Sequence, residues 1–331
     1  MAATRPMVAP RSSRLLPILQ QQGALLALVI VLSFGLLRYG ENFRSGFNVW
    51  ELLRNNTYYG LIALGMTFVI MSGGIDLSVG AVAALSAVTA ARLSPDGVWV
   101  GTLGAVGVGL LVGLINGSVI ARFKVQPFIV TLAMLLACRG AALNLSGNAN
   151  VSADFASGFI DIGQKNIGRV PLPVLIVVVA YLLGSVVLNF TRFGRHVLAI
   201  GGNEEAARLA GLPVARTTVA VYALSGACAG LAGAILAALA YTGSPNFAIG
   251  WELTAIAAVV VGGTLLSGGK GSVGTTLVGV VLLGLIFNEL NFEQGKGTFV
   301  LPQYWEEIIR GGFLLIVVLL QARLARRTTG G

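Results

Sequence analysis

The sequence predicts an all-α fold, a polytopic membrane protein of about ten transmembrane helices with one short helix outside the bilayer. Of its 331 residues, 56% are hydrophobic and 11% are charged, and the mean hydropathy is +0.85. Water-soluble domains of this length do not reach such values. Apolar runs of about 20 residues, long enough to cross a bilayer as a helix, recur along the chain. One polar stretch, residues 192–216, interrupts them.

The chain opens with a basic segment, residues 1–14, which we assign to a cytoplasmic tail. Its three arginines precede the apolar run 23–37, an order that also occurs in signal peptides. The run has no small-x-small cleavage site and is followed directly by Arg38. The sequence therefore predicts a first transmembrane helix rather than a cleaved leader.

Ten apolar runs are predicted to be membrane spans. The six long ones are residues 17–37, 98–121, 126–145, 171–190, 217–240 and 306–321. The four that are shorter or interrupted by glycine are residues 58–71, 81–91, 253–266 and 273–290. Together they predict a single transmembrane domain over residues 15–322, followed by a cytoplasmic tail over residues 323–331. A count of eight stays open if one short pair turns back within the membrane.

The distribution of Lys and Arg predicts which side each loop faces. With ten spans and a cytoplasmic N-terminus, most basic residues fall on the cytoplasmic side and most acidic residues on the other, as the positive-inside rule requires. Both termini and residues 192–216 are then cytoplasmic. This orientation explains the net charge of +9, because the basic residues are scattered and form no stripe of the kind that binds nucleic acid.

Two glycine-rich segments resemble each other, and each separates two short apolar runs. They read SGGIDLSVG at residues 72–80 and SGGKGSVG at residues 267–274. Interrupted segments in matching halves of a transporter indicate its translocation path, so we interpret the pair as a duplicated element, with two independent glycine-rich turns as the alternative. The second segment lacks the first glycine and the hydroxyl residue of a phosphate-binding loop, so we expect no nucleotide site there.

Asp76 is an acidic residue surrounded by apolar sequence. An intramembrane carboxylate is a candidate functional group, but Asp76 or Ser78 could instead cap the following helix, and we favour the cap. Other polar residues near span ends could bind a hydroxylated substrate or act as packing contacts. The candidate path residues are Asp76, Ser72, Asn56, Asn116, Thr131 and Asn288.

Glycines repeat every four residues in two apolar runs, at Gly109, Gly113 and Gly117 and again at Gly226 and Gly230. Such spacing lets the backbones of neighbouring helices approach closely. Cys138 and Cys228 lie inside apolar runs and predict neither a disulfide nor a metal cluster. We expect no catalytic residue, metal or cofactor in this chain, and we assign no catalytic role to His196, its only histidine.

The polar stretch reads RFGRHVLAIGGNEEAARLAGLPVAR at residues 192–216. In hydrocarbon each of its charges would cost about 2.5 to 3.5 kcal/mol, so the stretch must lie in water. Its pattern predicts a short helix that ends at Gly211 and Pro213. We interpret this helix as a surface for a motor protein, with an ordinary solvated connector as the alternative.

The chain resembles the membrane permease subunits of ribose-type monosaccharide ABC importers, such as the ribose, xylose, arabinose and galactofuranose systems. The matching segments are GMTFVIMSGGIDLSVG (65–80), VQPFIVTLAML (125–135), RFGRHVLAIGGNEEAARLAG (192–211) and VVGGTLLSGGKGSVGTTLVG (260–279). The resemblance implies a multi-pass protein of the bacterial inner membrane, surrounded by lipid. It also implies a second permease subunit, identical or homologous, a cytoplasmic ABC ATPase that binds ATP and Mg²⁺, and a periplasmic sugar-binding protein.

The resemblance further implies a site that couples the permease to its ATPase. The coupling pattern of ABC importers is Glu-Ala-Ala with a glycine four residues later, and Glu205, Ala206, Ala207 and Gly211 match it. The implied contact residues are Gly202, Asn203, Glu204, Glu205, Ala206, Ala207, Arg208 and Gly211. Closure of the ATPase would pull such helices together and admit sugar alternately from each side, with no chemistry in this chain.

Two other functions remain as alternatives. A branched-chain amino acid ABC permease shares the general build of this class. An ion-coupled secondary transporter could use Asp76 as a proton or cation site, although no embedded lysine or histidine accompanies this acid. An intramembrane enzyme would need a catalytic motif, and the sequence shows none.

Overall fold

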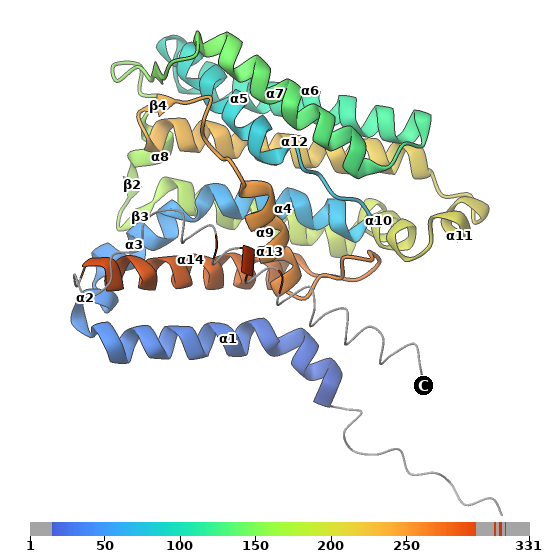
Figure 1. Cartoon of the computed structure of the whole chain (residues 1–331), viewed down its shortest axis with the longest axis horizontal. Coiled ribbons are helices and arrows are strands. Elements are labelled where there is room, and N and C mark those ends of the chain that lie inside the picture. Colours follow the sequence, from blue (N-terminus) through green and yellow to red (C-terminus); the bar gives the residue numbers. More distant parts are fainter. Residues whose placement is uncertain (1–14, 296–307, 309–310, 313–314, 316–331) are drawn as a thin grey trace, which may run out of the picture.

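The structure is a computed structural model that describes residues 15–295 together with Ile308, Gly311, Gly312 and Leu315. Its long helices form a bundle in which most axes run side by side (Figure 1). These helices are α1 (Leu15–Tyr39), α4 (Thr57–Met71), α5 (Val79–Leu93), α6 (Val98–Phe123), α7 (Pro127–Ser146), α9 (Leu172–Phe190), α12 (Val214–Leu239), α13 (Trp251–Val261) and α14 (Val273–Gly295).

Nine of the ten predicted spans are helices in the structure. Five of these, α6, α7, α9, α12 and α14, are long and apolar enough to cross a membrane. At 1.5 Å per residue, α4 and α5 with 15 residues each reach about 22 Å, and α13 with 11 residues about 16 Å. A hydrocarbon core is about 30 Å thick, so these three are partial spans. The tenth predicted span, residues 306–321, lies almost wholly outside the described residues.

Two predicted boundaries are wrong by five residues. The run 273–290 continues as a helix to Gly295, and the other error lies in the run before it. The run 253–266 was expected to form one span, but α13 ends at Val261. Gly263 adopts a φ of 90°, and the backbone N–H groups of Gly263 and Thr264 bond back to Val260 and Val259. This is the glycine-terminated helix end in which a left-handed residue satisfies the last carbonyls. Residues 262–266 therefore belong to the turn after α13.

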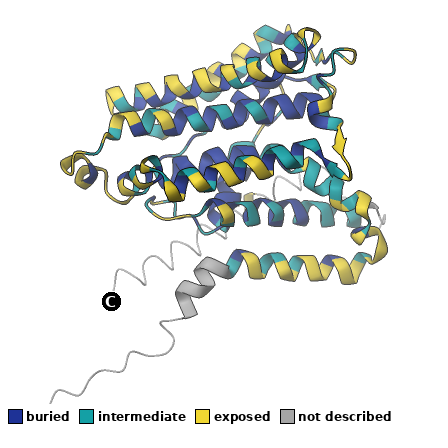
Figure 2. Ribbon diagram, turned by 180° about the vertical axis from the view of Figure 1, so that it is seen from behind, coloured by how far each residue is buried: buried dark blue, intermediate teal, exposed yellow. Residues whose placement is uncertain are grey.

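The centre of the bundle consists of α4, α5, α12 and α13, whose residues are mostly buried (Figure 2). A helix that is apolar on all sides is expected to be enclosed by other helices. The outer helices α1, α6, α7 and α9 instead expose large apolar side chains. Leu37 of α1, for example, is 89% exposed. Exposed apolar faces of this extent on long helices are those that lipid would cover.

The predicted glycine spacing brings α6 and α12 into backbone contact. A β-carbon at Gly109 would overlap the carbonyl oxygen of Gly226, and one at Gly230 would lie 2.6 Å from the carbonyl oxygen of Ala105. A β-carbon at Gly113 would overlap the carbonyl oxygen of Tyr222. The small residues thus serve close helix packing, as predicted.

Short elements lie at the two ends of the bundle (Figure 1). One end carries α10 (Arg192–Gly202) and α11 (Glu204–Leu209). The other end carries α2 (Glu41–Arg44), α3 (Gly46–Asn55), the 3-10 turn Ser94–Asp96, α8 (Asp161–Gln164) and two antiparallel strand pairs, β1 (Val151–Ser152) with β4 (Thr242–Gly243) and β2 (Asn166–Ile167) with β3 (Val170–Pro171). The sequence analysis did not predict this second group. Apart from α3, its elements have only two to four residues, too few to show a periodicity.

Candidate coupling surface and translocation site

Five of the eight predicted coupling residues, 204–208, lie in α11, which projects from one end of the bundle (Figure 1). Gly202 is the last residue of α10, and Asn203 and Gly211 flank α11. The helix begins at Glu204 because the side-chain oxygen of Asn203 accepts the backbone N–H of Ala206 at 2.9 Å. Glu204 pairs with Arg208 one turn later at 2.5 Å. The helix ends as predicted, since Gly211 takes a left-handed φ of 78°.

Exposure divides the eight predicted coupling residues. Ala207 is 5% exposed and faces the bundle, whereas the other seven are exposed. Leu209, which the sequence analysis did not single out, is 82% exposed beside them. The free face of α11 therefore combines charged groups, small residues and one apolar side chain, a combination suited to docking on another protein.

The helix α10 links α11 to the centre of the bundle. It begins where the Thr191 hydroxyl accepts the backbone N–H of Gly194 at 3.2 Å. Its inner face buries Val197 and Ile200. The ring of Phe193 stacks on that of Phe68 in α4, with ring centroids 6.2 Å apart. The helix α10 thus connects α11 to the C-terminal end of α4.

Asp76 lies in the turn between α4 and α5, which we call the first elbow (residues 72–78), and is 1% exposed. Its Oδ1 accepts the backbone N–H of Ser78 at 3.0 Å and the Ser78 hydroxyl at 2.6 Å. Its Oδ2 accepts the hydroxyl of Ser225 in α12 at 2.9 Å. None of the salt bridges among the described residues includes Asp76. The carboxylate therefore joins the elbow to α12 immediately before α5 begins.

Two further candidate path residues hold the same elbow. Asn116 of α6 donates from Nδ2 to the Ser78 hydroxyl at 3.0 Å. The hydroxyl of Thr131 in α7 accepts the backbone N–H of Leu77 at 3.1 Å. Both side chains are fully buried, so in this conformation they are packing contacts. Three helices, α6, α7 and α12, thereby fix the first elbow.

A polar cleft of about 590 Å³ separates the first elbow from α11. Its lining includes Ser72, Gly73, Lys124, Gln126, Glu204, Arg208, Arg216 and Tyr222. Ser72 is the one candidate path residue in it, and the Ser72 hydroxyl bonds to the carbonyl of Val69. The cleft gives the elbow a polar opening at the end of the bundle that bears α11.

The remaining two candidate path residues, Asn56 and Asn288, lie elsewhere. Asn56 directly precedes α4 and Ser72 directly follows it, which places the two residues about 24 Å apart along the helix axis. Asn288 exchanges two side-chain hydrogen bonds with Asn48 of α3, at 2.9 and 3.4 Å. The structure thus divides the six residues between the two ends of the bundle instead of gathering them in one site.

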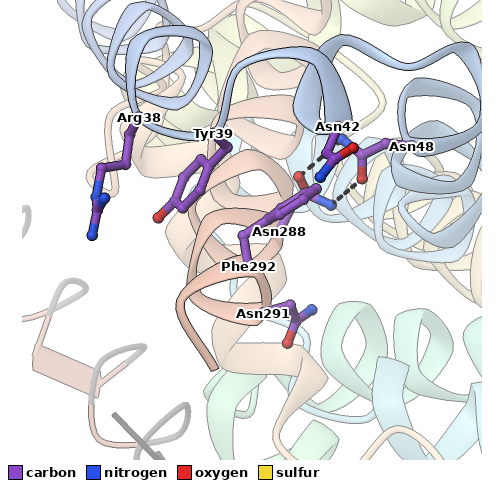
Figure 3. Close-up of a pocket in the computed structure, with 7 residues that line it drawn as sticks. All are labelled: Arg38, Tyr39, Asn42, Asn48, Asn288, Asn291 and Phe292. Atoms are coloured by element: carbon purple, nitrogen blue, oxygen red, sulfur yellow. Dashed lines mark hydrogen bonds between the residues drawn. The ribbon is translucent and has the colours of Figure 1, made fainter. Parts of the chain in front are cut away.

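Asn288 lies in a groove of about 530 Å³ at the end opposite to α11 (Figure 3). The groove is lined by Arg38, Tyr39, Asn42, Asn48, Asn288, Asn291 and Phe292. Arg38 pairs with Glu293 at 3.1 Å, and the Tyr39 hydroxyl donates to the same carboxylate at 3.0 Å. Amide groups beside aromatic rings can bind a neutral hydroxylated molecule through hydrogen bonds and ring contacts.

Two partners in these networks escaped the sequence analysis. Ser225 is a hydroxyl residue within the apolar helix α12, 149 positions from Asp76, and Asn48 lies 240 positions from Asn288. No local spacing links residues so far apart, so only the folded chain reveals these pairs.

A bundle of apolar helices with polar networks at both ends, and with an exposed helix at one end, defines a polytopic membrane protein of the permease class. Residues 48–318 match the family model described as the permease component of branched-chain amino acid transport systems. This chain belongs to that family of membrane permeases.

Three curated relatives align with most of the chain. The ribose import permease RbsC of Bacillus subtilis is 39% identical over 312 residues, which cover 92% of this chain and 94% of the relative. The L-arabinose permease AraH of Escherichia coli is 36% identical over 324 residues, or 97% of each chain. The L-arabinose ABC transporter permease AraH of Azospirillum brasilense is 38% identical over 274 residues, 82% of this chain and 79% of the relative. No solved structure matches the chain.

Proposed function

We propose that this chain is the transmembrane permease subunit of an ATP-driven ABC importer for a monosaccharide. The observation that carries this proposal is the exposed helix α11, which bears the coupling pattern in a chain similar over most of its length to ribose and arabinose permeases. A second permease subunit completes the path, a periplasmic binding protein delivers the sugar, and a cytoplasmic ATPase binds ATP and Mg²⁺. The chain itself catalyses no reaction.

The proposal places the end with α10 and α11 in the cytoplasm, with the protein in a bacterial inner membrane. With the basic tails counted on the same side, 13 of the 22 Lys and Arg residues fall on the side of residues 192–216, as the positive-inside rule requires of a cytoplasmic face. The amide-lined groove then opens toward the periplasm, where sugar arrives. The tails at residues 1–14 and 323–331 lie outside the described residues, and the proposal makes both cytoplasmic.

Uptake by reconstituted vesicles tests the function. The permease, its partner ATPase and its partner binding protein are placed in proteoliposomes, and accumulation of labelled D-ribose, L-arabinose and L-leucine is followed. We expect accumulation of a sugar that requires ATP and both partners. Accumulation driven by a proton gradient alone would support the secondary transporter, and uptake of leucine in place of sugar would support the amino acid permease.

A charge reversal in α11 tests the coupling surface, and the chain offers a matched control. Glu204 and Asp161 each pair with a basic residue four positions later, at opposite ends of the bundle. Exposed pairs of this kind contribute at most about 1 kcal/mol, so lysine at either position has a similar local cost.

We expect Glu204→Lys to lose the ATPase on co-purification and to abolish uptake, whereas Asp161→Lys keeps the ATPase. Equal retention of the ATPase by both variants would remove α11 from the interface.

A further inference from the structure

The two glycine-rich segments have equivalent structures, but the structure matches different residues than the sequence comparison does, which aligned residues 72–74 with 267–269. In the first elbow, Gly73 has a φ of 85°, and the N–H groups of Gly73 and Gly74 bond to Ile70 and Val69. Gly263 ends α13 with the same geometry, and α5 and α14 both begin at the valine of a Ser-Val-Gly sequence. Gly73 therefore corresponds to Gly263, and the second elbow (residues 262–272) is four residues longer.

The additional residues of the second elbow extend to the first elbow and bond to it. The backbone N–H of Gly269 donates to the carbonyl oxygen of Met71, the last residue of α4, at 3.0 Å. A β-carbon at Gly268 would lie 2.9 Å from the backbone nitrogen of Gly73. In addition, the hydroxyls of Thr67 in α4 and Thr276 in α14 are hydrogen-bonded at 3.0 Å. The two halves of the duplicated element are thus joined at their turns.

The C-terminal end of α10 packs into this junction through backbone atoms. A β-carbon at Gly201 would overlap the Met71 carbonyl oxygen and lie 2.6 Å from the nitrogen of Gly269. A β-carbon at Gly269 would lie 2.8 Å from the Cα of Gly202. Gly201 therefore touches the junction of α4 with the first elbow and the second elbow at once, three positions before α11 begins.

Contacts between backbones transmit displacement because no side chain can rotate to absorb it. A movement of α10 must shift both Met71 and Gly269 or break the contact. The first elbow holds Asp76 and its bonds to α12, and the second elbow begins α14. Both halves of the repeat would therefore move together.

We propose that Gly201, Gly268 and Gly269 are positioning residues that couple α11 to both elbows simultaneously. This proposal depends on the proposed function only in the experiment that measures sugar uptake. A side chain at position 201 would separate the backbone of α10 from those of Met71 and Gly269. The ATPase would then still hydrolyse ATP, but its movement would no longer displace the two elbows. Glycine is required at Gly268 and Gly269 for a second reason, because their φ angles of 83° and 75° are left-handed.

The first experiment compares Gly201→Ala with Gly140→Ala in the complete reconstituted importer. Gly140 lies within α7, and a β-carbon there would meet no atom within 4 Å. We expect Gly140→Ala to behave as the wild type. Gly201→Ala should assemble with the ATPase and hydrolyse ATP, with sugar uptake per ATP reduced about tenfold or more. Equal uptake per ATP in the two variants would overturn the proposal.

The second experiment needs no glycine variant and applies even if Gly201→Ala fails to assemble. Hydrogen exchange is measured on the wild-type complex, with and without a non-hydrolysable ATP analogue. We expect the peptides that contain the two elbows to change protection together when the analogue binds. A change in one elbow alone would overturn the proposal. Absence of sugar uptake by the wild-type complex would instead contradict the proposed function. The hydrogen exchange result would still show whether the two elbows respond together.

Discussion

Replacement of Gly109 by alanine tests whether glycine-mediated packing of α6 on α12 stabilises the bundle. The new β-carbon would overlap the carbonyl oxygen of Gly226 and lie 2.9 Å from the Cα of Gly230. An ordinary contact is 3.5 to 4.0 Å, so the helices must separate locally by about 1 Å. Both helices have 26 residues and are packed along their length, which leaves little room for such a shift. Overpacking of this kind costs about 1 to 3 kcal/mol.

Replacement of glycine by alanine within a helix also stabilises the helix by about 1 kcal/mol. The variant Gly107→Ala is the control for this gain. Gly107 lies on the same helix with no atom within 4 Å of its β-carbon, so the difference between the variants isolates the packing cost.

The assay is thermal unfolding of the purified protein in detergent. We expect Gly109→Ala to melt several degrees below Gly107→Ala, because about 1 kcal/mol corresponds to roughly 2 to 4 °C in a chain of moderate size. Equal melting temperatures would refute the packing argument.

Two other substitutions address buried polar groups near the first elbow. Asp76→Ala removes the acceptor for one backbone N–H and two hydroxyls, so we expect the free energy of unfolding to fall by about 2 to 4 kcal/mol. Asp76→Asn keeps an acceptor oxygen, so its free energy of unfolding should fall by less than half as much. If the asparagine variant folds normally but fails in transport, the charge itself is required and a purely structural role is wrong. Tyr222→Phe removes a buried hydroxyl for which the described residues provide no partner, so we expect unchanged or slightly higher stability in the same unfolding assay. A marked loss of stability on removal of this hydroxyl would contradict that expectation.

The sequence predicted the helices well because lipid imposes a strong constraint on every span. Backbone groups in hydrocarbon must bond within their own helix, so an apolar run of sufficient length has one stable structure. Nine predicted spans therefore appear at nearly their predicted residues. The error at α13 arose where glycine ends a helix inside an apolar run, since residues 262–266 include no charged residue that marks the true boundary.

The candidate path was less predictable. Asp76 was selected as an acid within apolar sequence, and Asn116 and Thr131 as polar residues near span ends. The structure brings all three to one elbow. Asn56 and Asn288 were selected by the same criterion and lie at the opposite end. Local sequence shows that a polar residue is present in a span, but not which other spans face it.

The sequence by itself determined the membrane class, the apolar helices and the exposed helix at residues 204–209, because hydrophobicity and helix-ending residues act over a few neighbouring positions. Only the tertiary structure decided that Gly201 of α10 meets both elbows, and that Gly263 rather than Gly268 corresponds to Gly73. These relations join residues separated by 68 positions (Gly201 and Gly269) to 190 positions (Gly73 and Gly263). They depend on how closely glycine backbones can approach once α4, α10 and the second elbow are packed. The spacing of residues within a short stretch of sequence does not determine the distance between these backbones.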